Sequence, residues 1–279
     1  GMSVFVVAEA GSNHCGDFGT ALRLIEAAAG TGADAVKFQM FRADRLYLPG
    51  PLREAARQWE MPVWWVPILA DLAARQGLEL MVSAFDKDSL DAVDPYVKRH
   101  KIASLEATDH ELVAHVVSKG KPIIISTGTM DRVEIRRLDT VLGPAYRRMV
   151  PTTLMHCVSA YPAPIEEANM NVLDYYAGDN EKLERVCEGF SDHSRDPILL
   201  PIMAVTLGAT VIEKHLRVVD TPSDAPDFPH SLTPYEFARM VKAIRDAESA
   251  LGDGIKRPMP SEQPLMALKR RPGKLRGEP

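Results

Sequence analysis

The chain has 279 residues, of which 46% are hydrophobic and 25% charged, an ordinary composition for a globular protein and a length that one α/β barrel can fill. The net charge of -5 gives no general reason to bind nucleic acid or an anionic membrane, and no apolar run approaches the length of a membrane span. The start lacks a basic region followed by an apolar leader. The three scattered cysteines form neither a disulfide framework nor a zinc-type pair. We therefore expect a cytoplasmic protein with reduced thiols.

A strand followed by a helix recurs along the chain. Residues 4–11 form a continuous apolar run, which is typical of a strand buried on both faces. Residues 19–32 then change to helical spacing, with Leu22, Ile25 and Ala29 on one stripe, and glycines end the helix. Further strands are expected at 35–41, 78–85, 101–106, 122–128, 152–159, 189–193 and 210–216, and further helices at 63–76, 89–96, 110–119, 132–142, 171–187, 197–207 and 234–251.

Strict alternation of strands and helices requires parallel strands joined by crossover helices. Because the prediction contains eight of each, it favours a closed (β/α)8 TIM barrel over an open doubly wound sheet. We expect a catalytic barrel domain at 1–252 and a proline-rich basic tail or linker at 253–279. Two segments interrupt the alternation: residues 42–62, a loop long enough to act as a lid, and residues 217–233, which contain three aspartates and three prolines.

Polar side chains gather where the predicted strands end, which is the functional face of such a barrel. They are Glu9, Lys37, Gln39, Ser83, Lys101, Ser104, Glu106, Ser126, Ser191, His193, Glu213 and His215. A barrel kept only for stability would end its strands in assorted loop residues, so this collection favours an enzyme.

The alternation of side chains along a strand tests which of these residues can point inward together. Lys37 and Gln39 share one face, and the spacing of two residues also holds for Ser191 with His193 and for Glu213 with His215. Lys101 is out of phase with Ser104 and Glu106, so a bulge or a position before the strand proper is required. Lys214 should face away from His215 and serve the structure.

His193 and His215 follow apolar runs that are expected to lie side by side as strands seven and eight. Two neutral imidazoles at adjacent strand ends can hold one divalent metal and leave its other positions open for substrate. The alternative is that two unrelated histidines happen to end neighbouring strands. Because lysines and hydroxyls end the other strands at the same face, we favour a metal site over two unrelated histidines.

Motifs in the same order along nearly the whole chain resemble those of the sialic acid synthase family, which includes N-acetylneuraminate and spore coat polysaccharide synthases. They are Ala8-Glu9-Ala10-Gly11-Ser12-Asn13-His14, Lys37-Phe38-Gln39, Ser126-Thr127-Gly128, His156-Cys157-Val158-Ser159-Ala160-Tyr161-Pro162, Ser191-Asp192-His193 and Glu213-Lys214-His215. The resemblance implies condensation of phosphoenolpyruvate with an N-acetylated amino sugar in its aldehyde form, giving a 2-keto sugar acid and phosphate. It also implies a homodimer.

The resemblance further implies roles for individual residues. His193 and His215 would hold the divalent metal, usually Mn2+, with Mg2+ or Co2+ as alternatives, and the metal would polarise the sugar aldehyde. The catalytic residues would be Glu106, Glu9 and Lys101, with Glu9 also in contact with the sugar. Lys37, Ser83, Lys101, Ser104, Ser126 and Ser191 match the phosphoenolpyruvate site, Tyr161 and Asp227 match further sugar contacts, and Gln39 is a further substrate-binding residue.

The sequence also departs from the family pattern. Ser159 stands where sialic acid synthases tend to have an asparagine beside the sugar, and the chain ends at Pro279 without the antifreeze-like domain that usually follows the barrel. These departures bear mainly on which sugar is used. They bear less on the expected use of a metal and of phosphoenolpyruvate. Two rival functions stay open: a Schiff-base aldolase that uses Lys101, and a barrel that binds sugar phosphates or metal without turnover.

Overall fold

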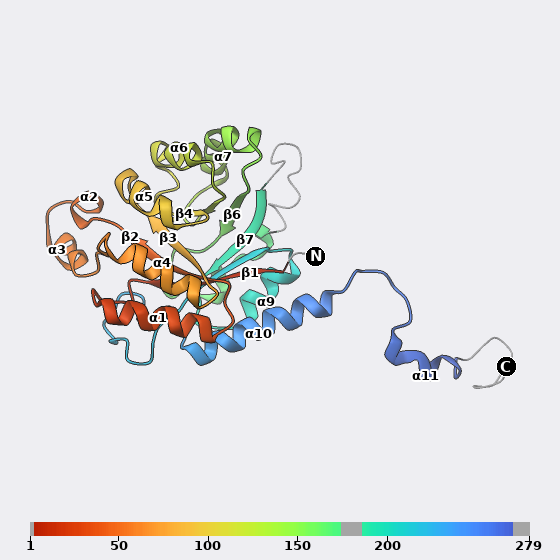
Figure 1. Ribbon diagram of the computed structural model, residues 1–279. Helices are drawn as coiled ribbons and strands as arrows, with labels where there is room; N and C mark the ends of the chain where they lie inside the picture. Colours follow the sequence, from red (N-terminus) through yellow and green to blue (C-terminus); the bar gives the residue numbers. More distant parts are fainter. Residues whose placement is uncertain (1–2, 174–185, 270–279) are drawn as a thin grey trace. The chain divides into compact units, whose positions relative to one another are not determined.

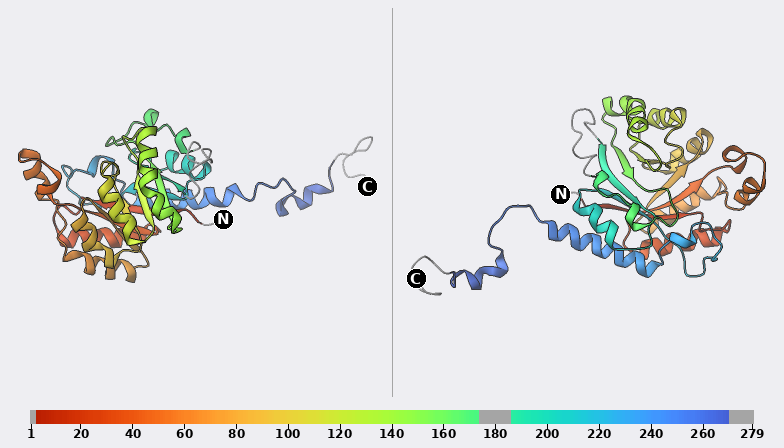
Figure 2. Two further views of the ribbon diagram at one scale, coloured as in Figure 1. Left: turned by 90° about the horizontal axis from the view of Figure 1, so that it is seen from above. Right: turned by 180° about the vertical axis from the view of Figure 1, so that it is seen from behind.

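The computed structural model describes residues 3–173 and 186–269 (Figure 1). Strands β1 to β8 run parallel and close into a barrel in sequence order, with β8 hydrogen-bonded to β1. Helices surround the strands, as the views from above and from behind show (Figure 2). The predicted (β/α)8 barrel is therefore confirmed. None of the helices in the described ranges is both long and apolar enough to cross a membrane.

The strands vary in length around the barrel. They are β1 (Phe5–Gly11), β2 (Ala35–Met40), β3 (Glu79–Ala84), β4 (His100–Ile102), β5 (Ile123–Ser126), β6 (Thr152–His156), β7 (Val186–Asp192) and β8 (Val211–His215). The prediction that strand four extends to Glu106 is wrong, because the segment after Ile102 folds into a turn. The N–H of Ala107 donates to the carbonyls of Ala103 and Ser104 at 3.1 and 3.3 Å, and not to a neighbouring strand.

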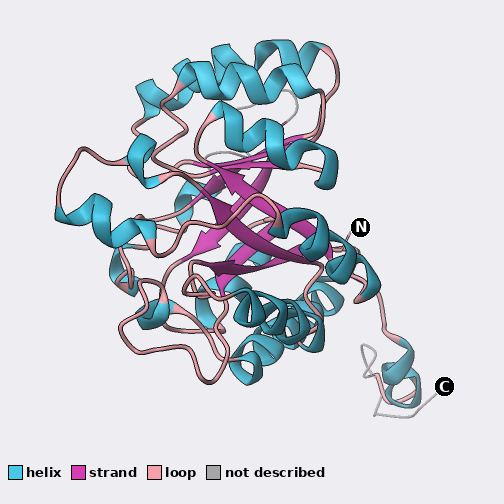
Figure 3. Cartoon of the chain, turned by 60° about the vertical axis from the view of Figure 1, so that its left-hand side comes forward, coloured by secondary structure: helices cyan, strands magenta, loops and turns pink. Residues whose placement is uncertain are grey.

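The helices on the outside of the barrel cover its strands (Figure 3). The helices of the described residues are α1 (Phe18–Gly30), α2 (Ala43–Leu46), α3 (Pro51–Arg57), α4 (Trp65–Arg75), α5 (Lys87–Val93), α6 (His110–Lys119), α7 (Arg132–Arg147), α9 (Leu199–Thr206), α10 (Pro234–Leu251) and, outside the barrel unit, α11 (Gln263–Met266), with 3-10 turns η1 (Asp94–Tyr96), η2 (Ile165–Glu167), η3 (Phe228–His230) and η4 (Pro260–Glu262). Aspartates begin four of them: the side chains of Asp17, Asp86, Asp109 and Asp131 accept hydrogen bonds from the first turns of α1, α5, α6 and α7. Such caps satisfy N–H groups that have no partner within the helix.

Three predicted elements differ from the structure. The helix expected at 171–187 falls largely on residues 174–185, which lie outside the described residues, and its predicted end is wrong because Val186 and Cys187 already belong to β7. The segment 42–62 is not only a loop: it contains α2 and α3, and Trp59 packs with the small apolar cluster of Phe41 and Ala56. The tail, expected to be a proline-rich basic tail or linker, contains η4 and the short helix α11.

The interior of the barrel is built in layers. The layer nearest the amino ends of the strands is apolar and contains Val7, Ala35, Met81, Ile124, Met155 and Val211, with Phe5 packed against it. Because side chains alternate along a strand, the inward residues two positions further on form the next layer, and these are polar. They are Glu9, Lys37, Ser83, Ser126, Ser191 and Glu213. The main hydrophobic core lies between strands and helices and includes Phe38, Leu69, Ile102 and Phe237.

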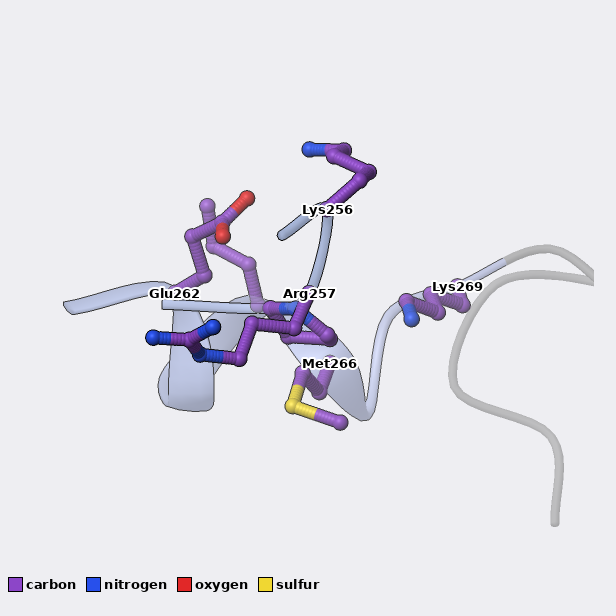
Figure 4. Close-up of a pocket in the computed structure, with 7 residues that line it drawn as sticks. Lys256, Arg257, Glu262, Met266 and Lys269 are labelled. Atoms are coloured by element: carbon purple, nitrogen blue, oxygen red, sulfur yellow. The ribbon is translucent and has the colours of Figure 1, made fainter. Parts of the chain in front are cut away.

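The chain forms two compact units, one at Gly1–Glu248 and one at Ser249–Pro279. Near the end of the first unit, Arg245 of α10 donates to Asp34 at 2.8 Å and to the carbonyl of Val4 at 2.6 Å. In the second unit, Arg257 pairs with Asp253 at 2.8 Å. A pocket of about 430 Å³ there is lined by charged and apolar side chains, among them Lys256 and Met266 (Figure 4).

Candidate active site

A buried lysine occupies the middle of the polar layer inside the barrel. The Nζ of Lys37 lies 3.1 Å from the carboxylate of Glu9 and 3.4 Å from that of Glu213. It also donates a hydrogen bond to the Oγ of Ser83 at 2.8 Å. Gln39 donates to the second oxygen of Glu9 at 2.9 Å. The expectation that Lys37 and Gln39 point inward together is confirmed.

A second lysine enters the same layer from β4. Lys101 donates to the Oγ of Ser126 at 2.7 Å, and its Nζ lies 3.9 Å from Glu213. Glu213 also accepts a hydrogen bond from Ser191 at 3.2 Å. Lys101 points inward because it lies in the regular part of the strand, whereas Ser104 and Glu106 follow in the turn. The turn therefore explains how Lys101 can point inward although its spacing to Ser104 and Glu106 is out of phase for one strand.

Within this layer the two carboxyl groups differ from each other in pKa, and so do the two lysines. Burial raises the pKa of Glu9 to about 7, against the lowering effect of Lys37. Burial would also raise the pKa of Glu213, but Lys101 and Lys37 together lower it. Lys37 keeps a raised pKa despite burial because it faces both carboxylates, whereas burial dominates at Lys101 and lowers its pKa. Glu9 is therefore the group most ready to change protonation near neutral pH.

A pocket of about 420 Å³ opens at the carboxyl ends of the strands, with Gln39, Glu106, Tyr161, His215 and Asp227 among the residues that line it. Glu106 is 9% exposed, and its Oε2 has no hydrogen-bond partner among the described residues. Burial raises the pKa of this carboxyl to about 7, which is suited to moving protons at neutral pH.

Ser104 lies at the wall between the pocket and the polar layer. Its Oγ accepts a hydrogen bond from the N–H of Gly128 at 3.0 Å and lies 3.2 Å from the Sγ of Cys157. A Cβ at Gly128 would lie 2.2 Å from the Oγ of Ser159 and 2.8 Å from that sulfur. The closeness of these groups explains why a glycine follows Ser126-Thr127.

Imidazoles gather at the ends of β7 and β8. The Nδ1 of His193 lies 2.7 Å from the carbonyl of Val158. Since a carbonyl only accepts, Nδ1 carries the proton and Nε2 keeps its lone pair, as in a metal-binding histidine. The Oγ of Ser191 lies 3.4 Å from this Nε2. The ring centre of His193 lies 5.7 Å from that of His215. The half-exposed ring of Tyr161 covers His193 at 4.4 Å between centroids.

A further histidine, His230 of η3, lies against the ring of His215 with 4.3 Å between centroids. Ligand atoms of His215, Asp227 and His230 lie within 4.8 Å of one another, a group that could hold a metal ion. Burial lowers the pKa of His230 to about 3 and that of His215 well below 6.5, so both rings are neutral at pH 7. The neutral ring is the form that binds a metal.

Asp227 is held in place by backbone contacts. Its Oδ2 accepts a hydrogen bond from the N–H of Ser12 at 2.8 Å. A Cβ at Gly11 would lie 2.2 Å from that oxygen, and Gly11 has a φ of +52°, so glycine is required at this point. Burial raises the pKa of Asp227 to about 6.

The structure thus brings all the predicted site residues to one end of the barrel, on two levels. It adds His230, which the sequence reasoning did not single out because no spacing signals it. It also places Glu213, which was expected at the end of its strand but was given no role, beside Lys37 and Lys101. Lys214 points away as expected and is buried against Asp192 at 2.5 Å. His156 bonds the carbonyl of Ala168 at 2.8 Å and serves the structure.

Comparison with known proteins agrees with this architecture. The model of the NeuB family matches residues 24–256. The chain belongs to the NeuB family. It is 39% identical to the N,N'-diacetyllegionaminic acid synthase of Legionella pneumophila, over 97% of this chain and 79% of that protein. It is 36% identical to the spore coat polysaccharide biosynthesis protein SpsE of Bacillus subtilis, over 92% of this chain and 70% of that protein.

A solved structure supports the same relationship. The N-acetylneuraminic acid (sialic acid) synthetase of Leptospira borgpetersenii, in complex with citrate, superposes with a TM-score of 0.86 and 30% sequence identity. The match covers 95% of this chain and 90% of that one. The resemblance to the sialic acid synthase family is therefore confirmed, and its relatives include enzymes named as synthases of acidic sugars.

Proposed function

We propose that this protein condenses phosphoenolpyruvate with the open aldehyde form of an N-acetylated amino sugar, giving a 2-keto sugar acid and inorganic phosphate. The observation that carries the proposal is the two-level site: paired lysines and hydroxyls in the barrel, beneath a pocket that presents histidines and the carboxyl of Glu106. The names of the relatives, synthases of diacetyllegionaminic and N-acetylneuraminic acid, support a substrate of the amino sugar class.

The lower level suits a small anion with two acidic groups. Lys37 with Ser83, and Lys101 with Ser126, each place an ammonium beside a hydroxyl. A phosphate and a carboxylate need this combination of charge and directional donors. In the free protein Glu213 lies near both lysines, because buried ammonium groups without a counter-charge would be costly. Binding of the anion would exchange some of these contacts for contacts to substrate.

The pocket above suits the aldehyde partner and a divalent metal, with Mn2+ as the first choice and Mg2+ or Co2+ as alternatives. The residues present fit a metal: the Nδ1 of His215 and both ring nitrogens of His230 are buried without a hydrogen-bond partner among the described residues. His193 and His215 are the ligands expected from the resemblance, and the Nε2 of His193 is unprotonated, with the Oγ of Ser191 3.4 Å away. When bound, the ion would act as a Lewis acid on the aldehyde oxygen.

The side chains account for the remaining steps. Carbon three of phosphoenolpyruvate forms the new bond to the aldehyde carbon, and water adds to carbon two. The resulting tetrahedral centre expels phosphate and leaves a ketone. Glu106 is the residue for the water step, since its carboxyl lines the pocket and its pKa of about 7 allows it to accept a proton near neutrality.

A phosphate-release screen tests the proposal. Purified protein with Mn2+ and phosphoenolpyruvate should release phosphate with N-acetylmannosamine or a related N-acetylated hexose. A chelator should stop release, and added Mn2+ should restore it. The absence of release over the whole set of N-acetylated hexoses would favour a barrel that binds its ligands without turnover.

One observation favours a second function. Lys101 is buried and has a lowered pKa, and a less basic amine is better able to form a Schiff base with a keto acid. An aldolase of that kind would be inactivated by borohydride in the presence of pyruvate and would tolerate chelators. The proposed condensation predicts the opposite result in both tests.

A further inference from the structure

His230 is a buried imidazole with no hydrogen-bond partner in the described part of the chain. It is 2% exposed, and neither its Nδ1 nor its Nε2 has a hydrogen bond. Leaving a polar group buried and unbonded destabilises the folded protein. Because both nitrogens of this buried ring are unbonded, a group that binds the protein in solution is expected to use one of them.

The surroundings of His230 limit what that group can be. The Nε2 of His230 lies 3.9 Å from Oδ1 of Asp227, and the Nδ1 of His215 lies 3.7 Å from Oδ2 of the same carboxylate. These separations are too long for hydrogen bonds. They suit atoms that bind one ion, since bonds of about 2.1 Å in an octahedral site place ligand atoms about 3.0 to 4.2 Å apart.

The backbone also holds the three residues in one place. The N–H of Leu232 donates to the carbonyl of His215 at 2.8 Å, which returns the loop to the end of β8. Asn13 then donates to the Oγ of Ser231 at 2.9 Å, next to His230. The segment between Asp227 and His230 is the turn η3, so both ligands belong to one small rigid unit.

We propose that His230 is a direct ligand of the divalent cation, and that His215, Asp227 and His230 form a site of two imidazoles and one carboxylate. This inference rests on the metal dependence of the proposed function, and it adds Asp227 and His230 to His215, one histidine of the expected pair. Three protein ligands on one side leave positions open for substrate oxygens, as catalytic metal sites require. Asp227 would then bind the ion and not only the sugar.

Direct measurement of Mn2+ binding tests the inference without substrate or turnover. Electron paramagnetic resonance measures the concentration of free Mn2+ in titrations of the wild type, His230→Gln and Asp227→Asn. We expect a site of one ion in the wild type and a loss of affinity of at least about tenfold in each variant. His115→Gln is the control, because His115 pairs with Asp91 on the barrel surface at 2.7 Å and its loss should leave the affinity unchanged.

A count of bound imidazoles identifies direct ligation. Pulsed resonance detects the nitrogen couplings of histidines on Mn2+, and His230→Gln should remove one of them while the far-ultraviolet circular dichroism stays the same. An unchanged count and an unchanged affinity in His230→Gln would overturn the inference, as would a wild type that binds no stoichiometric ion. His230→Asn gives a second variant in case the first fails to fold. Failure of the proposed condensation would instead appear as intact Mn2+ binding without phosphate release.

Discussion

Replacing Glu106 with glutamine should stabilise the protein at alkaline pH while removing its turnover. The wild-type carboxyl is 9% exposed and has a pKa raised by burial from 4.5 to about 7. This difference corresponds to a cost of ~3 kcal/mol for keeping the ionised form in the folded protein. Glutamine has nearly the same shape and cannot ionise, so the variant avoids that cost.

The sign of the effect follows from proton binding. The folded state holds the proton of Glu106 more tightly than the unfolded chain, so the contribution of this group to stability is largest below pH 4.5. It is lost as the pH rises through about 7. The stabilisation by Glu106→Gln should therefore be ~2 kcal/mol larger at pH 8 than at pH 5.

Urea unfolding at pH 5 and pH 8, without metal or substrate, measures this difference. Glu26→Gln is the matched control, because Glu26 is exposed on α1 and should show no such dependence. In the presence of both substrates and Mn2+, Glu106→Gln should lower the turnover rate by about 10²–10⁴-fold. An equal stability change at both pH values would refute the burial argument, and wild-type turnover would refute the catalytic role.

Three further predictions concern the metal, the anion and the glycine beneath Asp227. His215→Ala should abolish Mn2+ binding and turnover with a melting temperature close to that of the wild type; unchanged turnover would exclude this metal site. Phosphoenolpyruvate binding at pH 7.5 should take up protons, because a nearby anion raises the pKa of Glu9 further above about 7. Calorimetry in buffers of different ionisation enthalpy measures this uptake, which Glu9→Gln should remove; a wild type without uptake contradicts the assignment. Gly11→Ala would place a Cβ 2.2 Å from Asp227 and should weaken Mn2+ binding about tenfold or more in a resonance titration, whereas wild-type affinity would show that Asp227 is not a ligand.

The barrel was predictable because its signal is periodic. Apolar runs followed by helical spacing identify each unit, and alternation along a strand correctly placed Lys37 with Gln39 inside. The early end of β4 was not predictable, because the turn is set by contacts from other strands. Ser104 accepts a hydrogen bond from Gly128 at 3.0 Å, and no local pattern around Ser104 encodes that partner.

His230 shows a different limit of sequence reasoning. It lies in a segment rich in prolines and aspartates, where neither helical nor strand spacing applies. Its place beside His215 depends on the pairing of Leu216 with Leu232, a contact between residues that flank the loop. Metal ligands on regular strands can therefore be proposed from spacing, whereas a ligand on a loop requires the three-dimensional structure.

The fate of the bridging oxygen of phosphoenolpyruvate tests the proposed reaction most directly. Substrate labelled with 18O between carbon two and phosphorus is incubated with Mn2+, an N-acetylated amino sugar and the protein, and both products are weighed by mass spectrometry. Attack of water at carbon two predicts the label in phosphate and an unlabelled keto sugar acid that is heavier than the sugar by one pyruvate. Label kept in free pyruvate, without a keto sugar acid, would contradict the condensation and indicate simple hydrolysis at phosphorus.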